Sequence, residues 1–319
     1  MDATETALVR KTFESALAEG GADAAALLEN LGWWELYAAE PRVATAELFE
    51  AQGRLGRATS ALDVVVAQAF GQTLTGATAV LHPAPGMEDG PPGRAAGNGA
   101  VHFDGLVVAG LERASRLIVP YGDDGRLGLA EVELAGLDVR QVGGLDPGLR
   151  LVAVRGIAAP SGCAPAGEWA AVALAARRAL AHELCGLTQA VLDRAVAHVT
   201  DRHQFGRPIA AFQTVRHRLT EVYVALASAR SALDASWASG EPLLADAAKA
   251  LAGWAGLLAA RHCLQVTGAI GFTEEYQLAG RIRRVHLLDA LYGSADALQA
   301  AIGARLLADR SLPRLHPFP

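Results

Sequence analysis

The sequence predicts an α+β fold, mainly α, in which helical segments flank one small β domain. Three observations support this. Apolar residues recur at helical steps of three and four in residues 1–76 and again after residue 166. Residues 77–165 instead hold short β-rich runs between turn signals. The composition, alanine-rich and 51% hydrophobic, also favours helices. We therefore expect an N-terminal helical domain at 1–76, a middle β domain at 77–165, a C-terminal four-helix bundle at 166–310 and an extended tail at 311–319.

The first 76 residues are predicted to form four helices, separated by glycines and a proline. These helices cover Glu5–Leu17, Asp23–Leu31, Ala44–Leu55 and Ala61–Phe70. Between the second and third, Trp33, Trp34 and Tyr37 are expected to anchor the core of this domain or an interface, with a ligand-binding role as the alternative.

The middle segment is predicted to form strands because its apolar runs are short and lack helical periodicity. The runs are Ala79–Leu81, Leu106–Val108, Leu117–Val119, Leu127–Val132 and Leu149–Val154. Prolines, glycine pairs and the turn Asp123–Gly125 separate them. The Gly- and Pro-rich stretch Met87–Gly99 is predicted to be a mobile surface loop or a shortened excursion between strands.

After Ala166, helices are expected at about 167–203, 209–238, 243–268 and 273–307. The first two carry apolar stripes at the helical period, formed by Leu180, Leu184, Leu187 and Val191, and by Val215, Leu219, Val222 and Leu226. Gly206 can adopt a left-handed conformation and Pro208 cannot continue a helix, so the chain must turn near Phe205–Ile209. The tail Ser311–Pro319 contains three prolines and is expected to be extended.

Bulk properties exclude several function classes. A net charge of -6 and a pI near 5.9 argue against a nucleic-acid partner. The two lysines, Lys11 and Lys249, lie outside any P-loop motif. Cys163, Cys185 and Cys263 are widely spaced, which indicates reduced thiols. The N-terminus has no apolar signal core, and no apolar run reaches the roughly 20 residues of a membrane span. We expect a soluble cytoplasmic protein with no membrane partner.

Two gapped strings are more specific than helix packing requires. The first is RHQFGRPI at 202–209, followed by Phe212-Gln213 and His217-Arg218-Leu219, and the second is QVTGAIGFTEEY at 265–276. They resemble the R-x-x-F-G-x-x-I-x-x-(F/H)-Q and Q-x-x-G-G-x-G-F-x-x-E-Y signatures of the acyl-CoA dehydrogenase family. Their order and separation also match. The resemblance implies that family's layout of helical domain, β domain and four-helix bundle.

The resemblance implies FAD as cofactor and an acyl-CoA thioester as substrate. In the family, a carboxylate removes the α proton while the flavin accepts the β hydride. The family's elbow arginine and glutamine, here Arg202 and Gln213, reach the FAD of a partner subunit across an interface. An arginine suits a diphosphate because its planar fork can bond two oxygens at once. The second string implies that Gln265 and Gly268 line the same FAD, with Ala269 at the family's second glycine.

Structural roles are the alternative for these residues. Arg202 could be a solvated cation at a helix end, and Gln213 and Gln265 could be surface amides. Phe205 is assigned to the cofactor-binding set, although an aromatic residue at a helix elbow is often part of a core.

The family's catalytic glutamate has no counterpart in the sequence. One branch places it after a tyrosine in a Y-E-G-T string, where this chain has Tyr292 followed by Gly293. The other branch places it thirteen residues before Gln189, at Ala176. Neither residue can accept a proton, so no catalytic residue is assigned. Glu183 lies two turns after Ala176, about 10 Å along the axis, and is more simply a solvated or helix-pairing residue than a relocated base.

The middle segment also departs from the family. Its members carry a P-G-x-G-S-D loop and a W-(I/V)-(S/T) strand at the flavin. After Leu81–Gly86 this chain has no G-S-D, and no tryptophan occurs between Trp34 and Trp169. We therefore expect its own flavin pocket to be degenerate and its contribution across the interface to be intact.

This combination resembles the short subunits of heteromeric α2β2 acyl-CoA dehydrogenases that actinobacteria use on steroid-derived thioesters. It implies a larger partner subunit that supplies the base, with this chain inactive alone. Two alternatives stay open: a self-sufficient homo-oligomeric flavoenzyme whose base has moved to Glu183, and a non-catalytic scaffold subunit.

Two other groups of residues are given structural readings. His198, His203 and His217 do not share a helix face with a carboxylate, so no metal site is expected. The run Arg281–His286 is expected to be a charged helix face that pairs with Asp289 or Glu275, and contact with CoA phosphates is the alternative.

Overall fold

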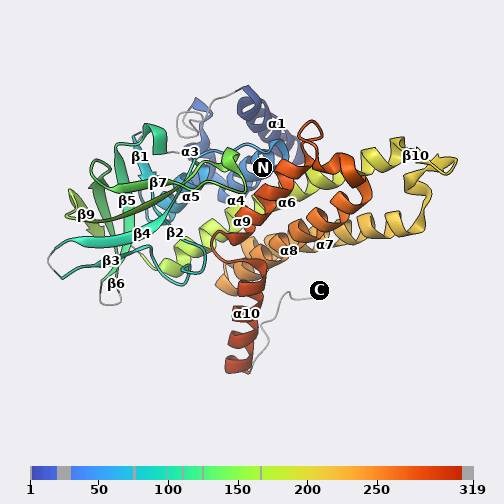
Figure 1. Cartoon of the computed structure of the whole chain (residues 1–319). Coiled ribbons are helices and arrows are strands. Elements are labelled where there is room, and N and C mark those ends of the chain that lie inside the picture. Colours follow the sequence, from blue (N-terminus) through green and yellow to red (C-terminus); the bar gives the residue numbers. More distant parts are fainter. Residues whose placement is uncertain are drawn as a thin grey trace. The chain divides into compact units, whose positions relative to one another are not determined.

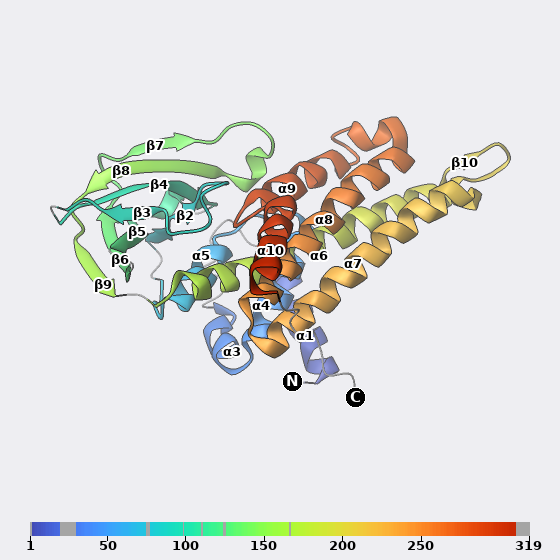
Figure 2. The same ribbon diagram turned by 90° about the horizontal axis from the view of Figure 1, so that it is seen from below.

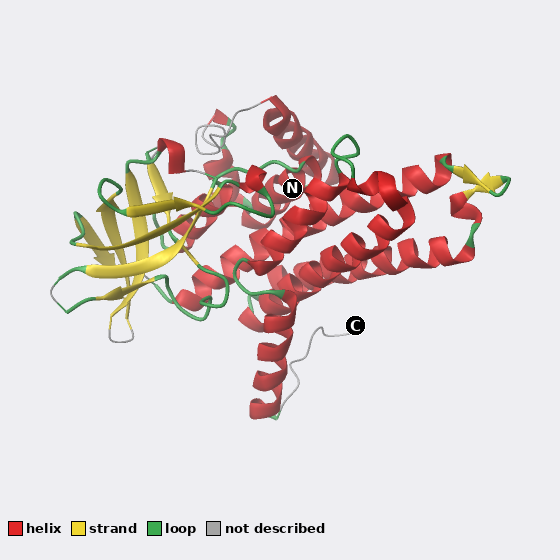
Figure 3. Cartoon of the chain, viewed as in Figure 1, coloured by secondary structure: helices red, strands yellow, loops and turns green. Residues whose placement is uncertain are grey.

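The computed structural model describes residues 2–19, 30–74, 77–97, 99–109, 111–123, 126–165 and 167–310. The chain forms two compact units, Met1–Leu48 with Arg57–Ala179 (unit 1) and Phe49–Gly56 with Leu180–Pro319 (unit 2). Helices, then strands, then helices follow one another along the chain (Figures 1 and 3). The mainly α, α+β class is therefore confirmed. The boundaries at 76, 165 and 310 stay predictions, and the tail lies outside the described residues.

The N-terminal helices agree with the sequence pattern where they are described. They are α1 (Ala3–Glu19), α3 (Trp33–Ala39), α4 (Pro41–Leu55) and α5 (Ala61–Ala69). Most of the helix expected at Asp23–Leu31 lies outside the described residues. Trp33 is fully buried, stacks on Tyr37 with 4.7 Å between ring centroids and meets the edge of Trp34 at 5.2 Å. This aromatic cluster is the anchor that the sequence predicts.

The β segment of unit 1 forms a nine-stranded sheet within the described residues, in the order β7-β8-β4-β3-β5-β6-β9, with β1 beside β5 and β2 beside β4. Figure 2 shows this succession from β7 to β9. The strands are β1 (Thr78–Val80), β2 (His82–Pro83), β3 (Gly93–Ala95), β4 (Val101–Val108), β5 (Arg116–Asp123), β6 (Arg126–Glu133), β7 (Asp138–Gln141), β8 (Leu151–Ala158) and β9 (Gly162–Pro165). Each predicted β-rich run overlaps a strand, and alternate apolar residues such as Leu117, Val119 and Val154 form the core of the sheet.

The structure corrects the expectation of a surface loop at Met87–Gly99. Within this stretch, β3 pairs antiparallel with β4 and parallel with β5. A Cβ atom on Gly93 would lie 2.9 Å from the carbonyl oxygen of Pro120 and 2.9 Å from a Val119 methyl group. The glycine therefore marks a close approach of neighbouring strands, which residue propensities do not reveal.

The C-terminal helices are α6 (Trp169–Asp201), α7 (Gln213–Ser239), α8 (Pro242–Thr267), α9 (Leu278–Ala290) and α10 (Ala295–Asp309). The part of α6 from Leu180 onward belongs to unit 2. Helices α6 to α9 share an apolar cluster that includes Val191, Leu219, Val222, Cys263 and Leu278. Most of both predicted apolar stripes is buried, as expected for helices that face a common core.

The last predicted helix, 273–307, is wrong as a single element. Residues 273–277 are not helical, and the helix is divided between Ala290 and Ala295. Tyr292 and Gly293 have positive φ angles of 56° and 103°, which an α-helix cannot accommodate. Ser294 then caps α10 by accepting a hydrogen bond from the backbone N–H of Ala297. As a result α10 departs from the direction of α8 and α9 (Figures 1 and 2).

Among the described helices, the one that includes α8 (Pro242–Phe272) is long and apolar enough to cross a membrane by length and composition. However, 67% of its most apolar window is buried within the structure. Such burial is expected of the central helix of a bundle.

Two glycines allow α4 and α6 to approach closely in unit 2. A Cβ atom on Gly186 would overlap the carbonyl oxygen of Glu50 and lie 2.8 Å from its Cα atom. A Cβ atom on Gly53 would lie 2.7 Å from the backbone nitrogen of Leu187. Backbone atoms cannot move aside as a flexible side chain can, so this contact requires glycine on both helices.

We predict that Gly186→Ala destabilises the protein by about 1–3 kcal/mol, because the added methyl group overpacks a backbone contact. The control is Gly303→Ala on α10, where an added Cβ meets nothing within 4 Å. There the change should stabilise by up to about 1 kcal/mol through helix propensity. Urea denaturation of both variants measures the difference. Equal stabilisation by the two substitutions would contradict the proposed contact.

Candidate functional site

The predicted elbow between α6 and α7 is present in unit 2. The helices are joined by a short hairpin and a 3-10 turn. The hairpin pairs β10 (His203–Gln204) with β11 (Arg207–Pro208), and the turn is η3 (Ile209–Ala211). Phe205 and Gly206 turn the chain with positive φ angles of 54° and 76°. The backbone N–H of Ile209 donates to the carbonyl oxygen of Arg202 at 2.8 Å, which closes the elbow. The predicted turn is thus confirmed.

A cavity of about 1000 Å³ lies in unit 2 beside this elbow. Its wall includes Arg194, His198, Arg202, Ile209, Ala269 and Arg281. Three arginines face two aspartates, Asp193 and Asp201, so the wall carries a net positive charge. Burial and the charge of Arg202 lower the pKa of His198, and its imidazole is therefore neutral at neutral pH. The arginines make this cavity suitable for an anionic ligand.

A reciprocal contact holds one wall of the cavity in place. The guanidinium group of Arg194 donates to the carbonyl oxygen of Tyr276, and the Tyr276 hydroxyl donates to the carbonyl oxygen of Arg194 at 3.0 Å. The Arg194 Cζ atom also lies 5.3 Å from the centre of the Tyr276 ring. This contact fixes the segment that follows the 3-10 turn η4 (Gly268–Phe272). The turn η4 itself supplies Ala269 and Ile270 to the cavity wall.

The sequence analysis missed Arg194 as a site residue. Arg194 and His198 lie four residues apart on one face of α6, and Arg202 follows at the same spacing just after the helix ends. This stripe of basic residues was a signal that could have located the cavity. Tyr276, the last residue of the second string, also lines the cavity, although the sequence analysis assigned it no site role.

The structure brings only part of the predicted cofactor-binding set into the cavity wall. Arg202 and Ala269 line it, and Gly268 precedes Ala269 with a φ of 65° at the end of α8. Phe205 is 90% exposed. Gln213 and Gln265 are also exposed, at the start of α7 and near the end of α8. These three residues are not part of the chain's own cavity wall.

The basic run of α9 has mixed roles. Arg281 lines the cavity and donates to the carbonyl oxygen of Arg54 at 2.6 Å. Arg283 pairs with Glu274 at 3.9 Å. The three cysteines are free thiols, and burial raises the pKa of the Cys263 thiol to about 12, which makes it unreactive at neutral pH.

Comparison with known proteins identifies the C-terminal part of the chain. Residues 169–307 match the family model described as acyl-CoA dehydrogenase, C-terminal domain. The acyl-CoA dehydrogenase IpdE2 of Mycolicibacterium smegmatis is 35% identical over 119 residues, which are 37% of this chain and 36% of that protein. The C-terminal part of the chain, residues 169–307, belongs to the acyl-CoA dehydrogenase family. The match spans about a third of the length of the curated relatives.

Solved structures extend the likeness in fold to the whole chain. The ChsE4-ChsE5 complex of Mycobacterium tuberculosis gives a TM-score of 0.73 at 18% identity and covers 98% of this chain and 99% of that one. The Tcur3481-Tcur3483 steroid ACAD gives 0.71 at 20% identity, covering 96% and 98%. A Mycobacterium smegmatis glutaryl-CoA dehydrogenase in complex with FADH2 gives 0.74 at 14% identity, covering 98% and 97%.

Neither of the two positions at which the sequence predicts a family base holds a residue that can remove a proton. Ala176 is fully buried in the part of α6 that belongs to unit 1. Gly293 lies in unit 2 between α9 and α10. Glu183, the alternative base, is 2% exposed and does not line the cavity.

A buried lysine holds the chain at the break between α9 and α10. The Nζ atom of Lys249, which is fully buried on α8, donates to the carbonyl oxygens of Asp289 (3.0 Å) and Gly293 (3.2 Å). The Asp289 carboxylate in turn accepts a hydrogen bond from the backbone N–H of Ala295, at the start of α10. The break between α9 and α10 is therefore stabilised by hydrogen bonds from a buried lysine and to a buried aspartate.

We predict that Lys249→Met destabilises the protein by about 1–3 kcal/mol, because two buried carbonyl oxygens lose their hydrogen-bond donor. Backbone amides at the start of α10 should exchange faster with deuterium. The matched control is Lys11→Met, which removes the exposed lysine of α1 and should leave both measurements unchanged. Equal exchange at α10 in the two variants would show that Lys249 does not hold the break.

Proposed function

We propose that this chain is one subunit of a heteromeric FAD-dependent acyl-CoA dehydrogenase, in which it binds FAD that a larger partner subunit mainly houses. One observation supports this most strongly. The chain has an arginine-lined cavity at its elbow, but Ala176 and Gly293 leave it without a carboxylate at either family base position. The binding part of a flavin site is therefore present without the proton-removing part.

The residues at the elbow fit the diphosphate of FAD. Arg202 lies in a cavity wall with a net positive charge, and its planar guanidinium group can bond two phosphate oxygens at once. Phe205, Gln213 and Gln265 are exposed beside it, as expected of residues that contact a cofactor shared with a second subunit. A solved relative in fold contains FADH2, which supports FAD as the cofactor.

The reaction has two steps that the proposal assigns to different groups. When bound, FAD accepts the hydride from Cβ of the acyl group. The α proton needs a carboxylate base, which the partner subunit supplies in this proposal. This chain would bind and orient the cofactor through Arg202, Gln213, Gln265 and the Gly268-Ala269 turn.

The substrate class is an acyl-CoA thioester, and we propose a bulky steroid-derived one. Two solved structures with this fold support the proposal: one is a complex named for two different proteins, and one is called a steroid ACAD. An α2β2 assembly and a cytoplasmic location belong to the same proposal. A self-sufficient enzyme that uses Glu183 is less consistent with the burial of that side chain outside the cavity.

We predict that Arg202→Ala raises the dissociation constant of FAD from the co-purified complex by roughly 10- to 100-fold, because charged hydrogen bonds to the diphosphate are lost. The control is Arg216→Ala, which removes an exposed arginine of α7 outside the cavity wall. Fluorescence titration of FAD measures both constants. Unchanged FAD binding by the folded Arg202→Ala complex would refute the assignment.

We also predict that the chain purified alone lacks flavin absorbance and activity. Co-production with an acyl-CoA dehydrogenase encoded beside it should give a yellow, active complex. A yellow and active chain without a partner would support a self-sufficient enzyme and would direct attention to Glu183→Gln. A colourless subunit bound to an independently active partner would support the scaffold alternative.

A further inference from the structure

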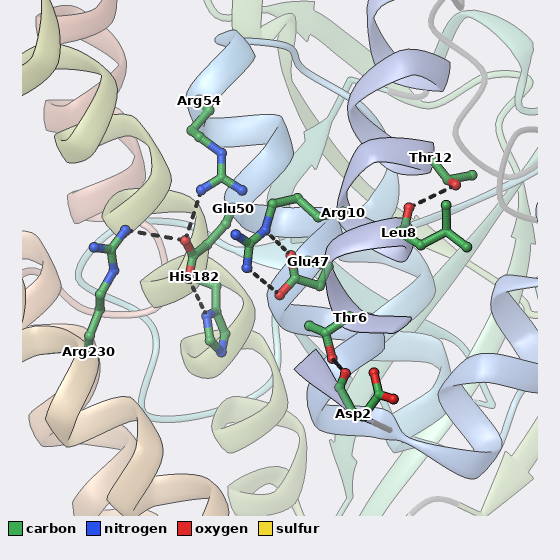
Figure 4. Close-up of polar contacts among 10 residues, drawn as sticks. All are labelled: Asp2, Thr6, Leu8, Arg10, Thr12, Glu47, Glu50, Arg54, His182 and Arg230. Atoms are coloured by element: carbon green, nitrogen blue, oxygen red, sulfur yellow. Dashed lines mark hydrogen bonds and ion pairs between the residues drawn. The ribbon is translucent and has the colours of Figure 1, made fainter. Parts of the chain in front are cut away.

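Glu50 lies at the centre of a charged cluster in unit 2, near the end of α4. Figure 4 shows its carboxylate between Arg54, Arg230 and His182. The Oε2 atom lies 3.3 Å from Nη1 of Arg54 and 3.4 Å from Nη2 of Arg230. The Oε1 atom lies 3.5 Å from Nδ1 of His182. Because the Glu50 side chain is only 18% exposed, these three partners supply most of its solvation.

A neighbouring tryptophan fixes the protonation pattern of His182. The indole N–H of Trp237 lies 3.1 Å from Nε2 of His182. An indole nitrogen can only donate, so Nε2 must be the acceptor and the imidazole proton belongs on Nδ1, which faces Glu50. The imidazole thus donates toward the carboxylate.

Glu50 is a carboxylate at neutral pH. Burial raises the pKa of its carboxyl group, but the hydrogen bond from His182 and the charges of Arg230 and Arg54 outweigh it, so the pKa lies below the ordinary value. The cluster therefore contains one negative charge that is shared by two arginines.

One route of side chains connects this cluster with the cavity. Arg230 donates to the side-chain oxygen of Gln189 at 3.1 Å, and Gln189 donates to Asp193 at 2.8 Å. Asp193 is part of the cavity wall. The carboxylate of Glu50 thus orders a chain of side chains that ends at that wall.

We propose that Glu50 is a positioning residue that sets the affinity of the cavity for FAD by ordering Arg230 and, through Gln189, the position of Asp193. The inference rests on the proposed FAD-binding function of the chain. Without the charge of Glu50, Arg230 loses the counter-charge that holds it in place. Gln189 and Asp193 then lose the contact that defines their positions beside and in the cavity wall.

The test compares Glu50→Gln with a matched substitution on the same helix. Glu47, three residues earlier on α4, is 7% exposed and binds Arg10 through both carboxylate oxygens at 2.6 and 3.0 Å (Figure 4). Glu47→Gln therefore removes a similarly buried ion pair, but the contacts of Glu47 with Arg10 do not involve the cavity wall. The conservative variant Glu50→Asp keeps the charge with a shorter side chain.

The FAD dissociation constant of the complex with the partner subunit is measured by fluorescence titration, and thermal unfolding is followed for each variant. We expect Glu50→Gln to raise the dissociation constant about tenfold, Glu50→Asp to restore most of the affinity and Glu47→Gln to leave it unchanged. If Glu50→Gln does not fold, Gln189→Met replaces it. That variant breaks the route from Arg230 to Asp193 without changing any charge, and it should also weaken FAD binding.

The outcomes separate the two proposals. If Arg202→Ala weakens FAD binding but Glu50→Gln acts no differently from Glu47→Gln, the role of Glu50 is refuted and the proposed function stands. Unchanged binding by Gln189→Met, where it replaces Glu50→Gln, has the same meaning. If Arg202→Ala also leaves FAD binding unchanged, the proposed function itself fails.

Discussion

The close contact between α4 and α6 is the constraint on which the rest of unit 2 depends. Packed helices usually keep their axes 8–10 Å apart because side chains separate them. At Gly53 and Gly186 no side chain intervenes, and backbone meets backbone. This contact places Glu50 beside His182 and brings the carbonyl oxygen of Arg54 within reach of Arg281. The position of one cavity wall thus depends on glycine at both positions.

Buried polar groups organise two different parts of this unit. A polar or charged group removed from water must be compensated by partners, so each one fixes the groups around it. The carboxylate of Glu50 gathers two arginines and a histidine near the cavity. The amino group of Lys249 holds two carbonyl oxygens at the break between α9 and α10. One group therefore supports the cavity wall, and the other fixes the position of the helix break.

In the proposed function, the two tasks of a flavin site are separated physically. Cofactor binding needs cations and an open cavity, and Arg194 on α6 and Arg202 just after it lie in the wall of such a cavity. Proton removal needs one carboxylate at a defined point, and substitution by Gly293 or Ala176 eliminates it without disturbing the elbow. A chain of this kind can keep the first task and leave the second to a partner, as proposed here.

The sequence by itself determined the mainly α fold, the elbow and the family. Helical periodicity, Gly206 with Pro208 and the two gapped strings are local features, and each is readable without contacts distant in sequence. Tertiary structure decided what depends on such contacts. The strand at Gly93, the break at Tyr292-Gly293 and the clasp of Arg194 with Tyr276 each require a distant neighbour. So does the cluster around Glu50, whose partners Arg54, His182 and Arg230 come from three helices that only folding brings together.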